Sequence, residues 1–167
     1  MDNSYLLYKS LHILGVILFV GNIIITGWWK VMADRTRNPV IIAYAQRQVT
    51  LTDFVFTAGG AALVLITGVI NAQAMGLVVK HGVVIDLSTL TLRWLANGYW
   101  LFVVSGILWV LVLIPIQIKQ ARMARAFAGG GPIPALYWKL CSVWLWVGIL
   151  ATLLPLGNLY WMVFKPA

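Results

Sequence analysis

Apolar residues dominate four stretches of the chain, and polar or charged segments separate them. The stretches cover about residues 5–29, 53–76, 95–118 and 138–163. Each approaches or exceeds the roughly 20 apolar residues that a helix needs to cross the hydrocarbon core of a bilayer. Because unpaired backbone groups are costly in lipid, each stretch is expected to be helical. The pattern predicts an all-α fold with a single domain over residues 1–167, an integral membrane four-helix bundle.

The composition supports this prediction. Of the 167 residues, 62% are hydrophobic and 10% are charged, whereas about 25% of the residues of a soluble protein are charged. Tryptophan and tyrosine gather near the ends of the apolar stretches, as they do at membrane interfaces. These residues are Trp28, Trp29, Tyr99, Trp100, Tyr137, Trp138, Tyr160 and Trp161. We therefore expect the lipid bilayer to be the main partner of the chain.

Basic residues predict the orientation of the bundle. They gather in two connecting segments, and under the positive-inside rule both segments are cytoplasmic loops and both termini face outward, to the periplasm. The residues are Lys30, Arg35, Arg37 and Arg47 in the first segment, and Lys119, Arg122, Arg125 and Lys139 in the second. These bases also suit anionic lipid head groups. The net charge of +8 does not indicate nucleic-acid binding, because the bases lie in short loops between apolar segments.

Asn38 and Pro39 predict the start of a helix, with Asn38 as the cap and Pro39 in the first turn. A short cytoplasmic helix over Val40–Val49 is then expected to lead into the second span. Asp53 comes as that span begins, where the helix dipole favours a carboxylate. We interpret Asp53 as a helix-start and loop anchor rather than a proton relay, because relay carboxylates usually lie deeper in the membrane.

Glycines and prolines predict further local features. Pro115 is expected to kink the third span, which continues as a basic helix over Ile116–Phe127. The segment 129–132 reads as a flexible connection, and Pro155 predicts a local break in the fourth span. Small residues in the second span predict close packing between helices, namely Gly59, Gly60 and Gly68.

Two ionisable residues occur inside the first apolar stretch. Lys9 and His12 are three residues apart, so they share one face of a helix. Ionisable residues are costly inside a bilayer and often mark a functional site. A helix rises about 1.5 Å per residue, which places His12 on the order of 10 Å inside the outer boundary of its span. Asn71 and Asn158 reach similar depths on the second and fourth spans, so the sequence predicts a polar layer near the outer face.

The chemistry of this layer has two interpretations. Imidazole is a good ligand for haem iron, copper or zinc, and bundles commonly hold haem b in this way. Lys9 could then neutralise a haem propionate, with Asn71 and Asn158 beside the cofactor. A second ligand would have to be His81, in an expected hairpin, or Met75 for copper. Alternatively, His12 is neutral and hydrogen bonds to Asn158 or Tyr8, and Lys9 extends its amine to the outer interface.

The remaining residue types exclude several sites. Cys141 is the single cysteine, so an internal disulfide and a CxxC motif are excluded, and we interpret Cys141 as a small packing residue. The N-terminal residues lack the positive region of a signal peptide. We therefore expect the first helix to remain in the mature protein.

Several segments together resemble a bacterial family of small integral membrane proteins, a domain of unknown function. They are Lys9–Gly15, Phe19–Asn22, Trp29–Arg37, Gln48–Asp53, Leu153–Pro155 and Val163–Pro166. The resemblance covers nearly the whole chain and implies four helices in the bacterial cell inner membrane. More distantly, the Lys9, His12 and Gly15 spacing is similar to the start of HemJ-type protoporphyrinogen oxidase, and to the copper-resistance D family. That resemblance implies His12 as an axial haem ligand.

Three functions remain open from the sequence, and no reaction is identified. The first is a redox or electron-transfer component with haem b at His12, which works with a membrane redox partner. The second is a copper-handling or small-solute membrane protein, with metal at His12 and His81. The third is a structural or assembly subunit of a membrane complex, or a homo-oligomer, that holds no ligand.

Overall fold

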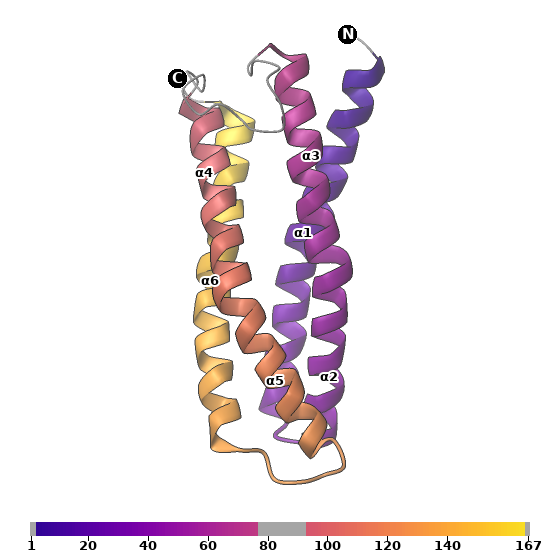
Figure 1. The fold of residues 1–167 in the computed structure, drawn as a ribbon, viewed down its shortest axis with the longest axis vertical. Helices are drawn as coiled ribbons and strands as arrows, with labels where there is room; N and C mark the ends of the chain where they lie inside the picture. The colour runs from indigo at the N-terminus through magenta and orange to yellow at the C-terminus, as the bar shows by residue number, and fades with distance from the viewer. Residues whose placement is uncertain (1–2, 77–92, 166–167) are drawn as a thin grey trace.

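The computed structural model describes residues 3–76 and 93–165, which form a bundle of long helical segments (Figure 1). The first is α1 (Asn3–Arg35) and the last is α6 (Ala135–Phe164). The second segment joins α2 (Pro39–Thr52), the π-helix η1 (Asp53–Ala58) and α3 (Gly59–Ala74). The third joins α4 (Arg93–Leu108), the π-helix η3 (Trp109–Leu113) and α5 (Ile114–Phe127).

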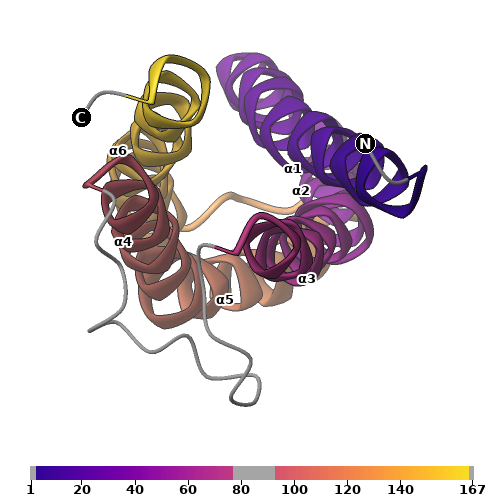
Figure 2. The same ribbon diagram turned by 90° about the horizontal axis from the view of Figure 1, so that it is seen from above.

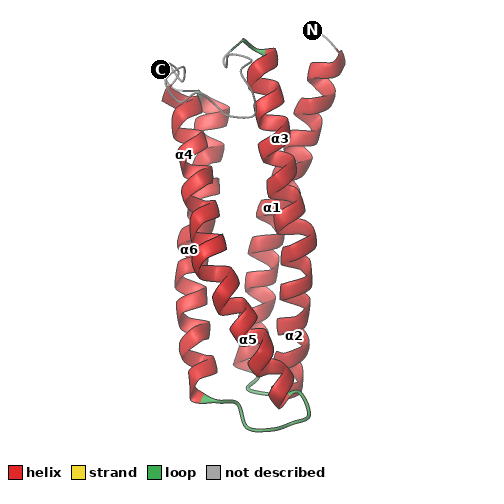
Figure 3. Cartoon of the chain, viewed as in Figure 1, coloured by secondary structure: helices red, strands yellow, loops and turns green. Residues whose placement is uncertain are grey.

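The predicted all-helical membrane fold is confirmed. Four helices in the described part of the chain are long and apolar enough to cross a membrane, and the described residues contain no strand (Figure 3). Many of their large apolar side chains are exposed on the outside of the bundle, where lipid rather than water would cover them. The chain is an integral membrane protein with four spans.

The bundle has two unlike ends. The described ends of α1, α3, α4 and α6 meet at one end, here called the terminal end, and the short connections 36–38 and 128–134 form the opposite, loop end (Figure 1). In the terminal half, α1 packs on α3 and α4 packs on α6. In the loop half, α2 packs on α5 and joins the two pairs. Viewed from above, α1 and α6 border one side of the bundle (Figure 2).

The second span begins earlier than its apolar pattern predicts. Asn38 caps the helix as expected, since its side chain accepts hydrogen bonds from the backbone N–H groups of Val40 and Ile41 at 3.0 and 3.3 Å. The helix then runs from Pro39 to Ala74 without interruption. Asp53 therefore lies inside a long helix and not at its start, and the interpretation of Asp53 as a helix-start anchor is wrong.

The two prolines inside the spans have different effects. Pro115 follows η3, and α5 is inclined to α4 (Figure 1), which confirms the predicted kink. The break predicted at Pro155 is wrong, because α6 is continuous. Pro155 has no N–H to donate to the carbonyl oxygen of Ala151. The hydroxyl of Ser105 on α4 donates to that oxygen at 2.8 Å and replaces the missing hydrogen bond.

One glycine explains how closely α1 and α3 approach. A Cβ atom added at Gly60 would lie 2.8 Å from the backbone nitrogen of Phe19 and 2.9 Å from the carbonyl oxygen of Gly15. Both contacts are with backbone, so a side chain at Gly60 would push the two helices apart. The neighbouring Gly59 has nothing within 4 Å of the same position. Close packing is thus confirmed for Gly60 but not for Gly59.

We expect Gly60→Ala to lower the thermal unfolding temperature in detergent, because overpacking a close contact costs about 1–3 kcal/mol. Gly59→Ala is the matched control and should unfold at the wild-type temperature or slightly above it, since alanine favours helix. Equal unfolding temperatures for the two variants would contradict this account of the α1–α3 contact.

Candidate functional site

A pocket of about 760 Å³ lies in the side of the bundle between α1 and α6. Its walls are mostly apolar and aromatic, and they include Phe19, Ile23, Phe102, Trp109, Trp144 and Leu145. Exposed side chains of both helices border it, among them Ile24 and Trp28 from α1 and Ile149 and Leu153 from α6. The surface around the pocket is that of the apolar spans, so the pocket faces the lipid.

Asp53 is a carboxylate in the wall of this pocket, and its residue is 9% exposed. Oδ1 accepts hydrogen bonds from Asn22 Nδ2 at 3.1 Å and from Thr57 Oγ1 at 3.0 Å. Oδ2 accepts a hydrogen bond from Gln117 Nε2 at 3.0 Å. The donors come from α1, η1 and α5, so a single carboxylate connects three of the four spans.

Two π-helical segments contribute residues to the pocket wall. Asp53 is the first residue of η1, and Trp109 and Leu113 of η3 line the pocket as well. A π-helical turn closes its backbone hydrogen bond over five residues rather than four, and such turns are often found at functional sites. In this protein, both π-helical segments place pocket residues in the interior of a continuous span.

No cationic side chain of the described residues forms an ion pair with Asp53. Within residues 3–76 and 93–165, the single ion pair is Lys30–Asp34. Asn22, which contacts Asp53, lies 13 residues before the end of α1 at Arg35, about 20 Å along the helix. An ionised carboxylate so far from water and without a cation is costly. Asp53 is therefore suited to hold a proton or to meet a cation that enters the pocket.

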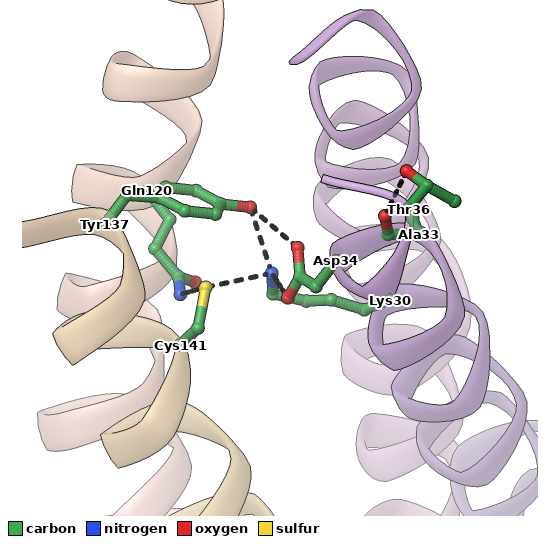
Figure 4. Close-up of polar contacts among 7 residues, drawn as sticks. All are labelled: Lys30, Ala33, Asp34, Thr36, Gln120, Tyr137 and Cys141. Atoms are coloured by element: carbon green, nitrogen blue, oxygen red, sulfur yellow. Dashed lines mark hydrogen bonds and ion pairs between the residues drawn. The ribbon is translucent and has the colours of Figure 1, made fainter. Parts of the chain in front are cut away.

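A second buried polar group, here called the Lys30 cluster, lies nearer the loop end and comprises Lys30, Asp34, Gln120, Tyr137 and Cys141 (Figure 4). Lys30 is 2% exposed. Its amine donates to Asp34 Oδ2 at 2.9 Å, to Tyr137 Oη at 3.1 Å and to Cys141 Sγ at 3.5 Å. These contacts use all three N–H donors of the lysine.

The remaining bonds of the Lys30 cluster connect α5 and α6 to α1. Tyr137 Oη donates to Asp34 Oδ1 at 3.2 Å, and Gln120 Nε2 donates to Cys141 Sγ at 3.3 Å. The place of Lys30 in the sequence suggested an exposed base in a loop. The structure shows instead that Lys30 is buried in the bundle. Cys141 is not a purely apolar packing residue, because its sulfur accepts two hydrogen bonds.

Sequence reasoning missed both polar groups, although signals for them were present. Lys30 and Asp34 have the i, i+4 spacing of a helical ion pair. Gln117 and Gln120 recur one turn apart on one face of a span, and polar residues inside a span usually face the bundle interior. The partners of these residues come from other helices, however, and their identity required the tertiary structure.

The structure places His12 in the contact between α1 and α3. His12 Nδ1 lies 3.1 Å from Thr67 Oγ1, and the imidazole covers Gly68. The Thr67 hydroxyl donates its proton to the carbonyl oxygen of Leu63, so it accepts a hydrogen bond from Nδ1–H of the imidazole. The helix-to-helix hydrogen bond of His12 was expected, but its partner is Thr67, not Asn158 or Tyr8.

The other residues of the predicted polar layer are not joined to His12. Asn71 is buried on α3, and Asn158 on α6 faces Gly98 of α4. The Oδ1 atoms of both asparagines have no hydrogen-bond partner among the described residues. Lys9 is exposed, with its amine 6.0 Å from the centre of the Tyr5 ring.

His81 and its expected hairpin lie outside the described residues. Within the described residues, no group of three or more His, Cys, Asp or Glu side chains is placed to hold a metal ion. Met75 Sδ accepts a hydrogen bond from the hydroxyl of Tyr5 at 3.8 Å. The roles predicted for His12, Lys9, Asn71, Asn158 and His81 in cofactor or metal binding stay predictions.

Comparison with known proteins gives a family but no activity. No curated protein matches the chain, and no solved structure matches it. The distant likeness to HemJ-type protoporphyrinogen oxidase and to the copper-resistance D family is therefore not supported by a match. One family model, described as "Predicted integral membrane protein (DUF2269)", matches residues 6–166. Since the match spans nearly the whole chain, the protein belongs to this family of integral membrane proteins.

Proposed function

We propose that the protein binds a lipophilic cation from the membrane, with Asp53 as the counter-ion. The observation that carries this proposal is the buried carboxylate of Asp53, which has no cationic partner among the described residues and lines a pocket of about 760 Å³. A volume of about 300–1,000 Å³ is typical of small-molecule sites. This function corresponds to the small-solute membrane protein that the sequence left open as an alternative.

The pocket walls support a cationic ligand with an apolar body. Aromatic rings attract cations through their faces, most strongly when water is excluded, and Phe102, Trp109 and Trp144 line the pocket. The remaining walls offer apolar contacts to the body of the ligand. A neutral apolar molecule could occupy the same walls, but it would gain no ion pair with the carboxylate of Asp53.

Binding of the cation at Asp53 is coupled to the release of a proton from the carboxyl group. Without a ligand, the proton neutralises the carboxylate; when the cation enters, the proton leaves. The groups that face Asp53 are neutral, namely Asn22 on α1, Thr57 on η1 and Gln117 on α5. Arg47 on α2 is exposed, and no described residue of α3 or α6 that lines the pocket is titratable. Binding should therefore strengthen as the pH rises.

The direction of the proton follows from the charge distribution. Exposed lysines and arginines gather at the loop end, among them Arg35, Arg37, Lys119, Arg122 and Arg125. On the positive-inside rule we assign the loop end to the cytoplasm and the terminal end to the periplasm of a bacterial inner membrane. In this orientation, the Lys30 cluster lies between Asp53 and the cytoplasm.

We expect the purified protein to bind tetraphenylphosphonium, measured by isothermal titration calorimetry in nanodiscs. Asp53→Asn should weaken binding by at least about tenfold, equivalent to about 1.4 kcal/mol, because the amide carries no charge. The wild-type affinity should rise with pH, and the affinity of Asp53→Asn should not. Neutral triphenylphosphine oxide serves as the control ligand; tighter binding of this neutral compound than of the cation would refute the proposal.

We further expect that filling the pocket blocks the ligand without altering the carboxylate. Gly106 and Gly148 line the pocket, and a Cβ atom at either has nothing within 4 Å. Gly106→Leu and Gly148→Leu should therefore fold normally but bind tetraphenylphosphonium more weakly. Gly21→Leu, at a similarly open position outside the pocket, is the control and should bind like the wild type. If all three variants bind equally, the cation is not in this pocket.

The second candidate is the haem b site predicted at His12, with copper as the alternative metal. One observation favours it: the hydrogen bond between Nδ1 and Thr67 Oγ1 orients the imidazole, as such hydrogen bonds do for metal-bound histidines. The described residues include no second histidine to complete a bis-histidine site. His12 would hold the iron through Nε2, and haem would supply electron transfer when bound.

If His12 is an axial ligand, protein expressed with ample haem should show a Soret band, and His12→Ala should abolish it. Copper found by metal analysis without a Soret band would select copper handling. A colourless, metal-free preparation would contradict both metal predictions. Wild-type behaviour of His12→Ala inside a larger co-purified complex would then favour the structural subunit.

A further inference from the structure

We infer that Asp53 exchanges its proton with the loop-end surface through a path of buried water and polar side chains that ends at the Lys30 cluster. This inference rests on the proposed function for its biological role. The path would supply the route by which the proton leaves Asp53 when the cation binds. The geometry that points to the path can be followed from Asp53 downward.

The first part of the path follows the buried face of α5. Gln117 Nε2 donates to Asp53 Oδ2 at 3.0 Å. Gln120 lies one turn further along α5 and is fully buried, and its Nε2 donates to Cys141 Sγ at 3.3 Å. The two glutamines therefore lie one turn apart on the buried face of α5, one bonded to Asp53 and the other to the Lys30 cluster.

The middle of the path contains buried polar atoms without partners. Both side-chain polar atoms of Gln46 and the Oε1 of Gln120 have no hydrogen-bond partner among the described residues. Gln46 is 1% exposed and lies on the buried face of α2, between Ile42 and Val49. Unpaired polar atoms in a buried position are expensive, and in native proteins ordered water usually satisfies them.

Facing helices bring these atoms into one layer. Ile42 and Ala124 of α5 belong to one packed cluster, and Val49 and Leu113 of the same span belong to another. Gln46 lies between Ile42 and Val49 on α2, as Gln120 lies between Leu113 and Ala124 on the opposite span. Three unpaired atoms from two facing helices suit a small group of water molecules, which can conduct protons where the amides themselves cannot.

The last part of the path reaches the surface. Lys30 donates to Cys141 and to Asp34, and Tyr137 donates to Asp34 as well. The side chain of Asp34 is 17% exposed, whereas that of Lys30 is 2% exposed. In this path, a proton that leaves Asp53 reaches the Lys30 cluster through the water layer. Lys30 transfers one of its protons to Asp34 Oδ2 and takes up one in its place, and Asp34 releases a proton to bulk water at the loop end.

Infrared spectroscopy can follow this exchange without any ligand. The protonated carboxyl of Asp53 has a C=O stretching band that is identified by its absence in Asp53→Asn. After transfer from H₂O to D₂O, the wild-type band should shift rapidly. In Gln120→Leu and in Gln46→Leu the shift should be at least tenfold slower, because leucine displaces the water. Gln120→Asn, which keeps an amide, should restore rapid exchange.

The control is Gln48→Leu, which makes the same substitution on α2 outside the buried face. Leucine at Gln46 replaces two polar atoms without a partner, and leucine at Gln120 replaces one such atom and the hydrogen bond to Cys141 Sγ, which keeps its bond from Lys30. Both variants should therefore unfold close to the wild-type temperature, and slow exchange cannot then be due to unfolding. Equal exchange rates in the wild type, Gln46→Leu and Gln120→Leu would overturn the path. The absence of any Asp53 carboxyl band at all pH values would overturn it too.

Two outcomes separate this inference from the proposed function. If tetraphenylphosphonium does not bind but the exchange slows in Gln120→Leu, the path stands and the cation proposal fails. If the cation binds and exchange is unaffected by both substitutions, the proton leaves through the pocket mouth, and the path fails while the binding proposal stands.

Discussion

The carboxylate of Asp53 is the interaction on which the interior of this bundle depends. Apolar side chains alone cannot select one arrangement of helices in lipid, because lipid tails are as apolar as leucine. Asp53 adds directional bonds to α1, η1 and α5 at one level of the bundle. The same bonds hold the carboxylate beside the pocket, so the group that orients the helices is also the group that a ligand would meet.

The two halves of the bundle are built from different interactions. In the terminal half, close backbone contact holds α1 against α3, with Gly60 facing Gly15. In the loop half, buried polar side chains connect α1 to α5 and α6, and Lys30 shares its amine among three partners. The pocket lies where these two modes of packing meet. In the loop half, contacts between α2 and α5 join the two helix pairs. In the terminal half, α1 pairs with α3 and α4 pairs with α6, which leaves room for the pocket between the pairs.

Irregular helix geometry in this protein is compensated by specific partners. η1 presents Asp53 and Thr57 toward α1 and α5, and η3 precedes Pro115. Pro155 leaves α6 straight because Ser105 supplies a hydrogen bond from α4. At Pro155, a side chain on a neighbouring helix thus prevents a local sequence signal from changing the course of the backbone.

The sequence by itself determined the number of spans, their helical nature, the Asn38 cap and the kink near Pro115, because these depend on hydrophobic length and on interactions within a few residues. It also marked His12 as unusual but did not identify its hydrogen-bond partner. Only the tertiary structure decided that Asp53 lies deep in a continuous helix, that Lys30 is buried and that α6 passes straight through Pro155. These features depend on residues such as Gln117, Tyr137 and Ser105, which are remote in sequence and become neighbours only when the helices pack.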